Sequence, residues 1–187
     1  MNRNLPSSNE ALRMLRDVGC KPNVIAHCVT VMKVATKLAE KIKRKGLRVD
    51  VELVRIGALL HDIGRSKTHD VDHAIVGGKI ARSLGLPESI IHIIERHVGG
   101  GITQEEAEEL GWPKGIYAPQ TLEEKIVTYA DKIVDGSKVV PLETTLDQLH
   151  RKLGHNHPAI ERIKQLQNEI LSLVSKPPPT EAGASSV

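Results

Sequence analysis

The sequence predicts an all-α protein, and three observations lead to this prediction. Apolar residues recur at alternating steps of three and four along most of the chain, which is the period of a helix face. Residues that begin or end helices stand between these segments: Ser, Thr or Asp before them, Pro at the first turn and Gly after them. The chain also has no glycine-rich phosphate loop and no Gly-x-Ser-x-Gly elbow. We expect eight or nine helices around one buried helix, and no sheet of consequence.

Length and composition favour one soluble domain. A chain of 187 residues can form one domain with a substantial core, which we place at residues 1–174 with extra terminal helices, before a disordered tail at 175–187. The two cysteines form no Cys-x-x-Cys pair, and no stretch is typical of a signal peptide or a membrane span. We therefore expect a cytoplasmic protein that does not bind membranes.

The charge pattern does not by itself indicate a nucleic-acid partner. The net charge is +3 with 26% charged residues, and aromatic residues make up 2% of the chain with no Phe. Proteins that bind single strands usually stack bases on aromatic rings, and this chain has almost none. The basic run at 41–45 is explained by a helix end, where cations complement the helix dipole. The alternative, a nucleic-acid patch, lacks interleaved aromatic residues.

The first two helices are predicted from their end signals. Ser7 or Ser8 can cap a short helix that ends at Gly19, and Pro22 suits the first position of a long helix that ends at Gly46. His27 lies beside the apolar stripe of that second helix and therefore borders the core. Taken alone, it fits a structural histidine as well as a metal ligand.

The third helix is predicted to be buried. From Asp50 to His61 the segment is apolar nearly all round, and it ends in His61-Asp62 before Gly64. Burying the Asp62 carboxylate is costly unless a cation neutralises it. The alternative is an aspartate that caps a turn beside a core histidine.

Two further helices carry histidines at their ends. One is expected to start near His73, with Gly77 and Gly78 one turn later, where the missing side chains let a neighbouring helix approach closely. The next runs from Pro87 to His97, which sits in its last turn and can face a cleft. His92 points elsewhere and is expected to be structural or solvated.

The segment 99–120 has loop character around one short acidic helix. It contains Trp112 and Tyr117 among prolines and glycines. Such an insertion between candidate ligands can be a lid over a site. It can equally be a surface loop held in place by its two rings, and the sequence leaves both alternatives open.

The C-terminal third begins with a capping box at 121–124, which opens a helix running to Val134. Asp131 interrupts the apolar stripe of that helix, so its carboxylate must be paired or bound to metal. Two amphipathic helices are expected at about 141–153 and 158–174. The histidines between them, His155 and His157, are assigned to the turn because no acid or cysteine lies near them in the sequence.

An ordered set of imidazoles and carboxylates runs through these predicted helices: His27, His61 with Asp62, His73, His97 and Asp131. This set resembles the HD superfamily of metal-dependent phosphohydrolases, and the stretch 61–64, His-Asp-Ile-Gly, matches its HDIG variant. The resemblance spans roughly residues 21–135, and the two further histidines make the chain similar to the dinuclear branch. Segment 99–120 is similar to an archaeal HDIG group. The chain departs from the family by Arg65, where Lys is frequent, and it lacks a Gly-Tyr-Pro signature.

The resemblance implies a metal ligand set: His27, His61, Asp62 and Asp131 for one ion, and His73 and His97 for a second, with Asp62 bridging. Mixed imidazole and carboxylate ligands suit Mn, Fe, Co, Ni or Zn, so we expect divalent transition metals, with two ions per chain. Asp62 and Arg65 would then be catalytic, with Arg65 and Lys67 on phosphate oxygens and Trp112 and Tyr117 beside a nucleobase.

These residues predict hydrolysis of a small phosphorylated substrate by a metal-activated water at a mono- or dinuclear His/Asp site. A small nucleotide or other phosphorylated metabolite is favoured over a polymer, which would need a longer basic track. The alternative is a non-enzymatic HD-fold module that senses a ligand or binds a partner. Homo-oligomer formation is left open.

Overall fold

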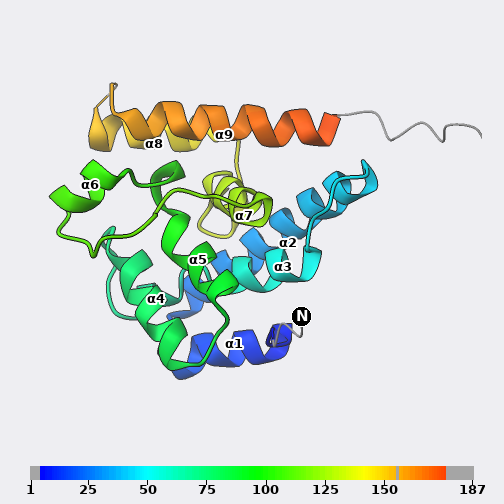
Figure 1. The fold of residues 1–187 in the computed structure, drawn as a ribbon, viewed down its shortest axis with the longest axis vertical. Coiled ribbons are helices and arrows are strands. Elements are labelled where there is room, and N and C mark those ends of the chain that lie inside the picture. The colour runs from blue at the N-terminus through cyan, green and yellow to red at the C-terminus, as the bar shows by residue number, and fades with distance from the viewer. Residues whose placement is uncertain (1–4, 155, 176–187) are drawn as a thin grey trace, which may run out of the picture.

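The computed structural model describes residues 5–154 and 156–175, and over this part the chain is almost entirely helical (Figure 1). The helices are α1 (Ser8–Asp17), α2 (Pro22–Arg44), α3 (Val51–Leu60), α4 (His73–Ser83), α5 (Glu88–Arg96), α6 (Gln104–Glu109), α7 (Leu122–Lys132), α8 (Leu142–Leu153) and α9 (Pro158–Ser175). Two 3₁₀ turns, η1 (Ile63–Ser66) and η2 (Val98–Gly100), follow α3 and α5. The predicted all-α class is confirmed.

Two predictions fall on residues that the structure does not describe. The tail expected at 175–187 lies, apart from Ser175 at the end of α9, outside the described residues. His155 also lies outside them, while His157 follows a turn just before α9. Among the described residues, no helix is both long enough and apolar enough to cross a membrane.

Helix α3 is the buried centre of the fold, as its composition predicts. It packs against α1, α2, α5 and α7, and from Leu53 on only Arg55 among its side chains is not buried. A helix that is apolar on all sides gains stability only when neighbours cover every face. In Figure 1, α1 lies on one side of this centre and α9 crosses the opposite side. The end of α3 therefore delivers His61 and Asp62 to the interior.

Side-chain caps explain the starts of four helices, α1, α3, α6 and α7. Ser7 accepts a hydrogen bond from the backbone N–H of Glu10, whose carboxylate accepts one from the N–H of Ser7, so Ser7 is the cap of α1. The same reciprocal box forms between Thr121 and Glu124 at α7. Asp50 caps α3 by accepting from the N–H of Leu53 at 3.0 Å. Such caps satisfy backbone donors that the first turn leaves free.

Glycines let α4 approach the end of α3 closely, as predicted. A Cβ placed on Gly64 would lie 1.9 Å from the carbonyl oxygen of His73 and 2.6 Å from the N–H nitrogen of Gly77. A Cβ on Gly77 would lie 2.7 Å from the side chain of Ile94 in α5. Side chains at these positions would separate the segments that carry Asp62, His73 and His97.

Helix α7 ends at Lys132, two residues before the predicted end. The chain then forms a short antiparallel hairpin, β1 (Val134–Asp135) and β2 (Lys138–Val139), whose turn is Gly136-Ser137. Gly136 has φ 56°, a left-handed conformation that glycine adopts without strain and that two-residue hairpin turns require. The hairpin contacts α2. Among the described residues, its two strands form the one sheet.

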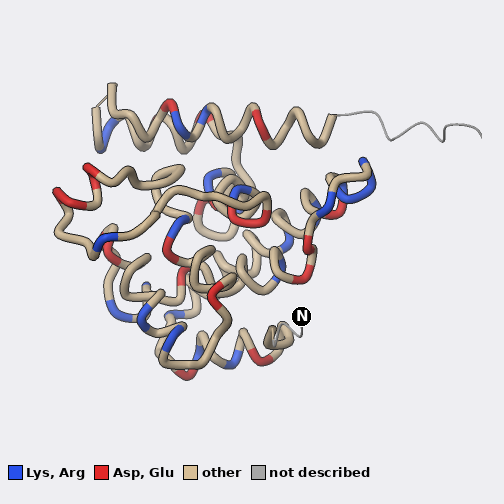
Figure 2. Tube along the Cα trace, in the orientation of Figure 1, with Lys and Arg blue, Asp and Glu red and all other residues tan. Residues whose placement is uncertain are grey.

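The basic run lies at a free helix end. Lys41, Lys43 and Arg44 belong to the last turn of α2 and are exposed, and Figure 2 shows this basic end of α2 extending away from the other helices. Cations in this position interact favourably with the C-terminal end of the helix dipole. The structure thus places the run where a solvated helix end was predicted.

Candidate metal centre

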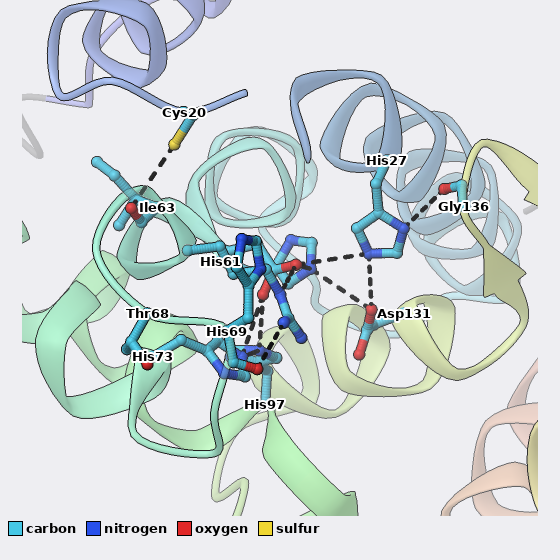
Figure 3. A network of polar contacts seen from close by, with 12 residues as sticks. Cys20, His27, His61, Ile63, Thr68, His69, His73, His97, Asp131 and Gly136 are labelled. Carbon is cyan, nitrogen blue, oxygen red and sulfur yellow. Dashed lines mark hydrogen bonds and ion pairs between the residues drawn. The ribbon is translucent and has the colours of Figure 1, made fainter. Parts of the chain in front are cut away.

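Five helices and one turn bring the six predicted ligands together (Figure 3). His27 lies in the second turn of α2, and Asp131 lies in the last turn of α7. The other four lie at helix ends: His61 at the end of α3, Asp62 directly after it, His73 at the start of α4 and His97 at the end of α5. At these helix ends the four side chains point into the interior, while the backbone that follows each helix turns away from it.

The first group joins two histidines to Asp131. The Nε2 atom of His27 lies 3.0 Å from Oδ1 of Asp131, and Nε2 of His61 lies 3.5 Å from the same oxygen. Both Nε2 atoms also approach Oδ2 of Asp62, at 3.8 and 3.7 Å. The ligand atoms of His27, His61 and Asp131 thus lie within 4.8 Å of one another, and Oδ2 of Asp62 lies beside both imidazoles.

The second group uses the other oxygen of the same aspartate. Nε2 of His73 lies 3.2 Å and Nε2 of His97 lies 3.4 Å from Oδ1 of Asp62. The two Nε2 atoms are only 3.0 Å apart. Asp62 therefore presents one oxygen to each group.

The far nitrogen of each ring is held by a backbone carbonyl. Nδ1 of His61 lies 2.8 Å from the carbonyl oxygen of Ala58. Nδ1 of His97 lies 2.7 Å from that of Ile94, and Nδ1 of His73 lies 2.6 Å from that of Asp70. In His27 the carbonyl is that of Gly136, at 2.9 Å. A carbonyl only accepts, so Nδ1 must carry the hydrogen and a neutral ring leaves its Nε2 lone pair free. All four Nε2 atoms face the two carboxylates.

Several buried atoms of the site have no adequate partner within the protein. Nε2 of His61 and Oδ1 of Asp62 are buried and have no hydrogen-bond partner among the described residues. Lone pairs on His73 and His97 that face each other at 3.0 Å repel unless a proton or cation lies between them. Buried polar atoms are normally paired, so this donor set fits a bound cation.

The ionisation state of the site suits cation binding. Burial tends to raise the pKa of Asp62, but the electrostatic interaction with His61 and the close contacts of His73 and His97 with the carboxylate outweigh burial and hold that pKa well below the usual value. The pKa of Asp131 is likewise well below its usual value, since Lys132 and His27 outweigh burial. Burial lowers the pKa of His97 to about 4. Near neutral pH the site therefore offers two carboxylates and a neutral His97.

Two basic side chains lie directly against the carboxylates. Nε of Arg65 donates to Oδ2 of Asp62 at 2.6 Å, and Nζ of Lys132 lies 2.5 Å from Oδ2 of Asp131. Sequence reasoning predicted Arg65 but missed Lys132; its position directly after Asp131 was the available signal. Lys67 differs from its prediction: its Nζ lies 3.5 Å from the carbonyl oxygen of Val18, outside the cavity lining.

The ligands open onto a cavity of about 500 Å³, a volume typical of small-molecule sites. Its lining includes part of the ligand set, both basic side chains, and polar residues from α2, the hairpin and α8: Asn23, His27, Asp62, Arg65, His69, Asp131, Lys132, Asp135, Gly136, Ser137, Thr145 and Gln148. The sequence analysis did not anticipate the contributions of Asn23, the hairpin and α8.

Trp112 and Tyr117 do not line this cavity, in contrast to the expectation that they contact substrate. Both are buried in a separate apolar cluster with Ala74, Ile75 and Ile102, and their rings meet edge to face at a centroid distance of 5.0 Å. The indole N–H of Trp112 donates to Asp72 at 2.6 Å. The rings attach the loop to α4, which corresponds to the alternative of a loop held in place by its aromatic residues.

Comparison with known proteins identifies the family of this chain and several relatives that carry different names. Residues 24–134 match the family described as HD domain. An uncharacterized protein of Methanocaldococcus jannaschii is 50% identical over 165 residues, which are 88% of this chain and 97% of that protein.

Two further relatives are longer proteins. A tRNA (cytidine(56)-2'-O)-methyltransferase of Picrophilus torridus is 40% identical over 172 residues, which are 92% of this chain and 48% of the relative. A ribonuclease Y of Acidothermus cellulolyticus is 30% identical over 152 residues, which are 78% of this chain and 27% of the relative. This chain therefore spans half or less of either relative.

Among solved structures, the HD domain of the Listeria monocytogenes phosphodiesterase PgpH in complex with cyclic-di-AMP has a similar fold. The TM-score is 0.54 at 18% sequence identity, and the match covers 90% of this chain and 98% of that chain. A second structure of the same domain matches with a TM-score of 0.52 at 18% identity. At this identity the likeness concerns the fold.

Proposed function

The chain belongs to the HD domain family, and on that premise we propose that it is a metal-dependent phosphohydrolase acting on a small nucleotide or another phosphorylated metabolite. One observation carries the proposal. Four histidines direct their Nε2 atoms at two carboxylates, within a buried site where some of these atoms have no protein partner. Buried groups of this kind are costly without a compensating cation, and the site opens onto a cavity that can admit a ligand.

The donor set supports a pair of divalent transition metals. In the proposal one ion is held by His27, His61, Asp62 and Asp131, and the other by His73, His97 and Asp62. Imidazole and carboxylate without thiolate suit manganese, iron, cobalt, nickel or zinc. When bound, such ions would supply a water acidic enough to act as a nucleophile near neutral pH, and charge to stabilise phosphate oxygens.

The protein's own residues orient the substrate in this proposal. Arg65 bonds Asp62 through Nε, and one of its terminal nitrogens donates to the carbonyl oxygen of His69 at 3.3 Å. Its other terminal nitrogen is left to reach a non-bridging phosphate oxygen. Lys132 lies against Asp131 at the edge of the same cavity and provides a second positive charge. In the proposal Asp62 is a ligand of both ions. Arg65 and Lys132 bind and position the phosphate.

A second candidate substrate is RNA. It is favoured by the names of two relatives, a tRNA methyltransferase and a ribonuclease, which contain a segment similar to this chain. The basic run at 41–45 does not line the cavity, so it gives no continuous basic track into the site. We therefore favour a small nucleotide as the substrate. RNA is the alternative, and the same assay distinguishes the two.

The test is a hydrolysis screen of EDTA-treated protein with and without added manganese. The substrates are p-nitrophenyl phosphate, bis(p-nitrophenyl) phosphate, nucleoside monophosphates, diadenosine tetraphosphate and a short RNA. We expect manganese-dependent turnover of at least one small substrate by the wild type. Asp62→Ala should abolish it, because the shared carboxylate is lost. Asp147→Ala, an exposed carboxylate of α8 outside the cavity lining, is the matched control.

The possible results separate the hypotheses. Turnover of RNA alone would favour the RNA substrate. Full activity in Asp62→Ala would refute the bridging assignment. No turnover of any phosphate compound by metal-loaded wild type would favour the alternative function, a non-enzymatic module that uses the same fold to bind a ligand or partner.

A further inference from the structure

The cavity at the metal centre has one wall that lies beyond the family match. The HD domain match ends at residue 134, whereas five lining residues follow it: Asp135, Gly136, Ser137, Thr145 and Gln148. We call these five residues the C-terminal wall. They come from the β1–β2 hairpin and from α8. The metal ligands belong to the matched region, so the C-terminal wall lies outside the part of the cavity that the HD domain match covers.

The hairpin part of this wall is fixed to the helix that carries a metal ligand. The carbonyl of Gly136 accepts the Nδ1 hydrogen bond of His27 at 2.9 Å, and the hydroxyl of Thr30 donates to the carbonyl of Ser137 at 3.3 Å. The backbone N–H of Val140 donates to the carbonyl of Ile133 at 3.0 Å. The wall is thus held in a defined position relative to the ligands rather than attached as a loose loop.

The two side chains best suited to recognition on this wall form a pair. The amide nitrogen of Gln148 donates to Oδ2 of Asp135 at 3.1 Å, which orients both groups. Among the described residues the other carboxylate oxygen of Asp135 has no hydrogen-bond partner. Both side chains are exposed to solvent in the cavity. A ligand can therefore bond to them without breaking an interaction inside the protein.

Charge divides the cavity into two parts. The lysine and arginine side chains that line the cavity are Lys132 and Arg65. Each lies against a carboxylate of the metal centre. The C-terminal wall contributes a carboxylate, amide and hydroxyl groups and no cation. A phosphate group is therefore favoured at the metal centre and disfavoured at the wall. The wall suits a neutral group that donates hydrogen bonds.

We propose that Asp135 and Gln148 form a subsite for a vicinal diol, such as the ribose of a ribonucleotide, on the organic part of the substrate. This inference rests on the proposed function and names the substrate class. A carboxylate with a free oxygen accepts hydrogen bonds from both hydroxyls, which is how an acidic residue recognises ribose in dinucleotide-binding folds. The amide of Gln148 orients the carboxylate and offers its own oxygen as a second acceptor.

The test compares the binding of nucleotides that differ in one hydroxyl. The probes are adenine, guanine and cytosine nucleoside 5′-monophosphates with ribose or 2′-deoxyribose, titrated calorimetrically into EDTA-treated and manganese-loaded protein. Wild type should bind at least one ribonucleotide roughly tenfold more tightly than its deoxy form, the effect of one hydrogen bond to a charged group. Asp135→Ala should bind both forms equally, and Gln148→Ala should show a reduced preference.

The control is Asp147→Ala, which removes a neighbouring carboxylate of α8 that does not line the cavity and should keep the wild-type preference. Equal binding of the two sugars by wild type, no binding of either, or a preference that persists in Asp135→Ala would overturn the diol subsite. Because the readout is binding, a wild type that binds ribonucleotides selectively but hydrolyses nothing would contradict the proposed hydrolysis and not the subsite.

Discussion

Each imidazole of the metal centre is oriented by the hydrogen bond on the nitrogen that faces away from the site. For His61, His73 and His97 the acceptor is the carbonyl three residues earlier, so local chain geometry alone sets the ring. His27 instead depends on Gly136, 109 residues away. Bonds of this kind fix both tautomer and direction, and their loss typically lowers metal affinity about 10–100-fold.

His97 makes the metal-free protein less stable in mild acid. Burial lowers the pKa of His97 from 6.5 to about 4, so between these pH values the unfolded chain binds a proton that the folded chain does not. The free energy of unfolding therefore decreases as pH falls from 6.5 toward 4, by on the order of 3 kcal/mol at about 1.4 kcal/mol per pKa unit. Urea unfolding at several pH values in EDTA measures this.

The matched variant for that measurement is His97→Gln, which keeps a polar side chain but cannot titrate. It should show a weaker pH dependence than wild type across the same window. His27 acts in the opposite sense: hydrogen bonding to Asp131 outweighs burial and raises its pKa. If His97→Gln and wild type lose stability in parallel, the pH dependence has another origin.

At the scale of elements, the close contact of η1 with α4 determines where the second ligand group sits. We expect Gly64→Ala to reduce the free energy of unfolding by at least about 3 kcal/mol, because the new methyl would meet the backbone of His73 and Gly77, which cannot move aside. The displacement also moves His73 away from Asp62. Chemical denaturation and metal analysis of the purified variant would show both effects.

Gly78→Ala in α4 is the informative comparison. Its methyl would meet the Glu95 side chain, the nearest atom being Oε1 at 2.2 Å, and that side chain can rotate away with loss of its ion pair to Arg82. Alanine also gains roughly 1 kcal/mol of helix propensity over glycine. We expect a stability within about 1 kcal/mol of wild type. A loss as large as that of Gly64→Ala would show that the backbone contact is not the cause.

The loop at 99–120 is expected to act through α4 and not on substrate. Trp112 bonds Asp72, the residue before His73, and packs on Tyr117. Trp112→Ala should lower the free energy of unfolding by about 3–5 kcal/mol. Its KM values for a nucleotide and for p-nitrophenyl phosphate should change by the same factor. A selective increase for the nucleotide would restore the prediction that the rings contact a base.

At the scale of the whole molecule, the metal should stabilise the fold because its ligands come from five helices. We expect about two ions per chain by elemental analysis, and added manganese at 100 times its Kd should stabilise EDTA-treated protein by about 2.7 kcal/mol per site. For a chain of this length one such site raises Tm by roughly 5–10 °C. Thermal unfolding with and without manganese tests this.

Asp62→Ala provides the control for the metal effect. It should show little or no rise in Tm with manganese, while Asp147→Ala should match wild type. If wild type contains no metal and is not stabilised by manganese or iron, the donor set does not bind these ions. The structure would then need another explanation for the partnerless atoms of His61 and Asp62.

Sequence alone was enough for the fold class and most helix starts, and it named six candidate ligands whose side chains the structure brings together. Caps such as Ser7 and Thr121, and glycine stops, act through neighbouring backbone groups, so they can be read locally. The end of α7 was placed two residues too late because the hairpin that follows it is stabilised by contacts with α2. A carboxylate in an apolar stripe, as at Asp131, has a high desolvation cost. Its position in the sequence therefore indicates a paired or metal-bound group before the structure is known.

Tertiary structure decided which other residues reach the cavity. Lys67 was predicted there and turns toward Val18, whereas Lys132 lies against Asp131. Trp112 was expected beside substrate and lies in a separate cluster, and Gln148, which no motif marks, completes the C-terminal wall. The direction of a side chain at a helix end or in a loop depends on what packs around it. Contacts between distant segments set that packing, and sequence spacing does not encode them.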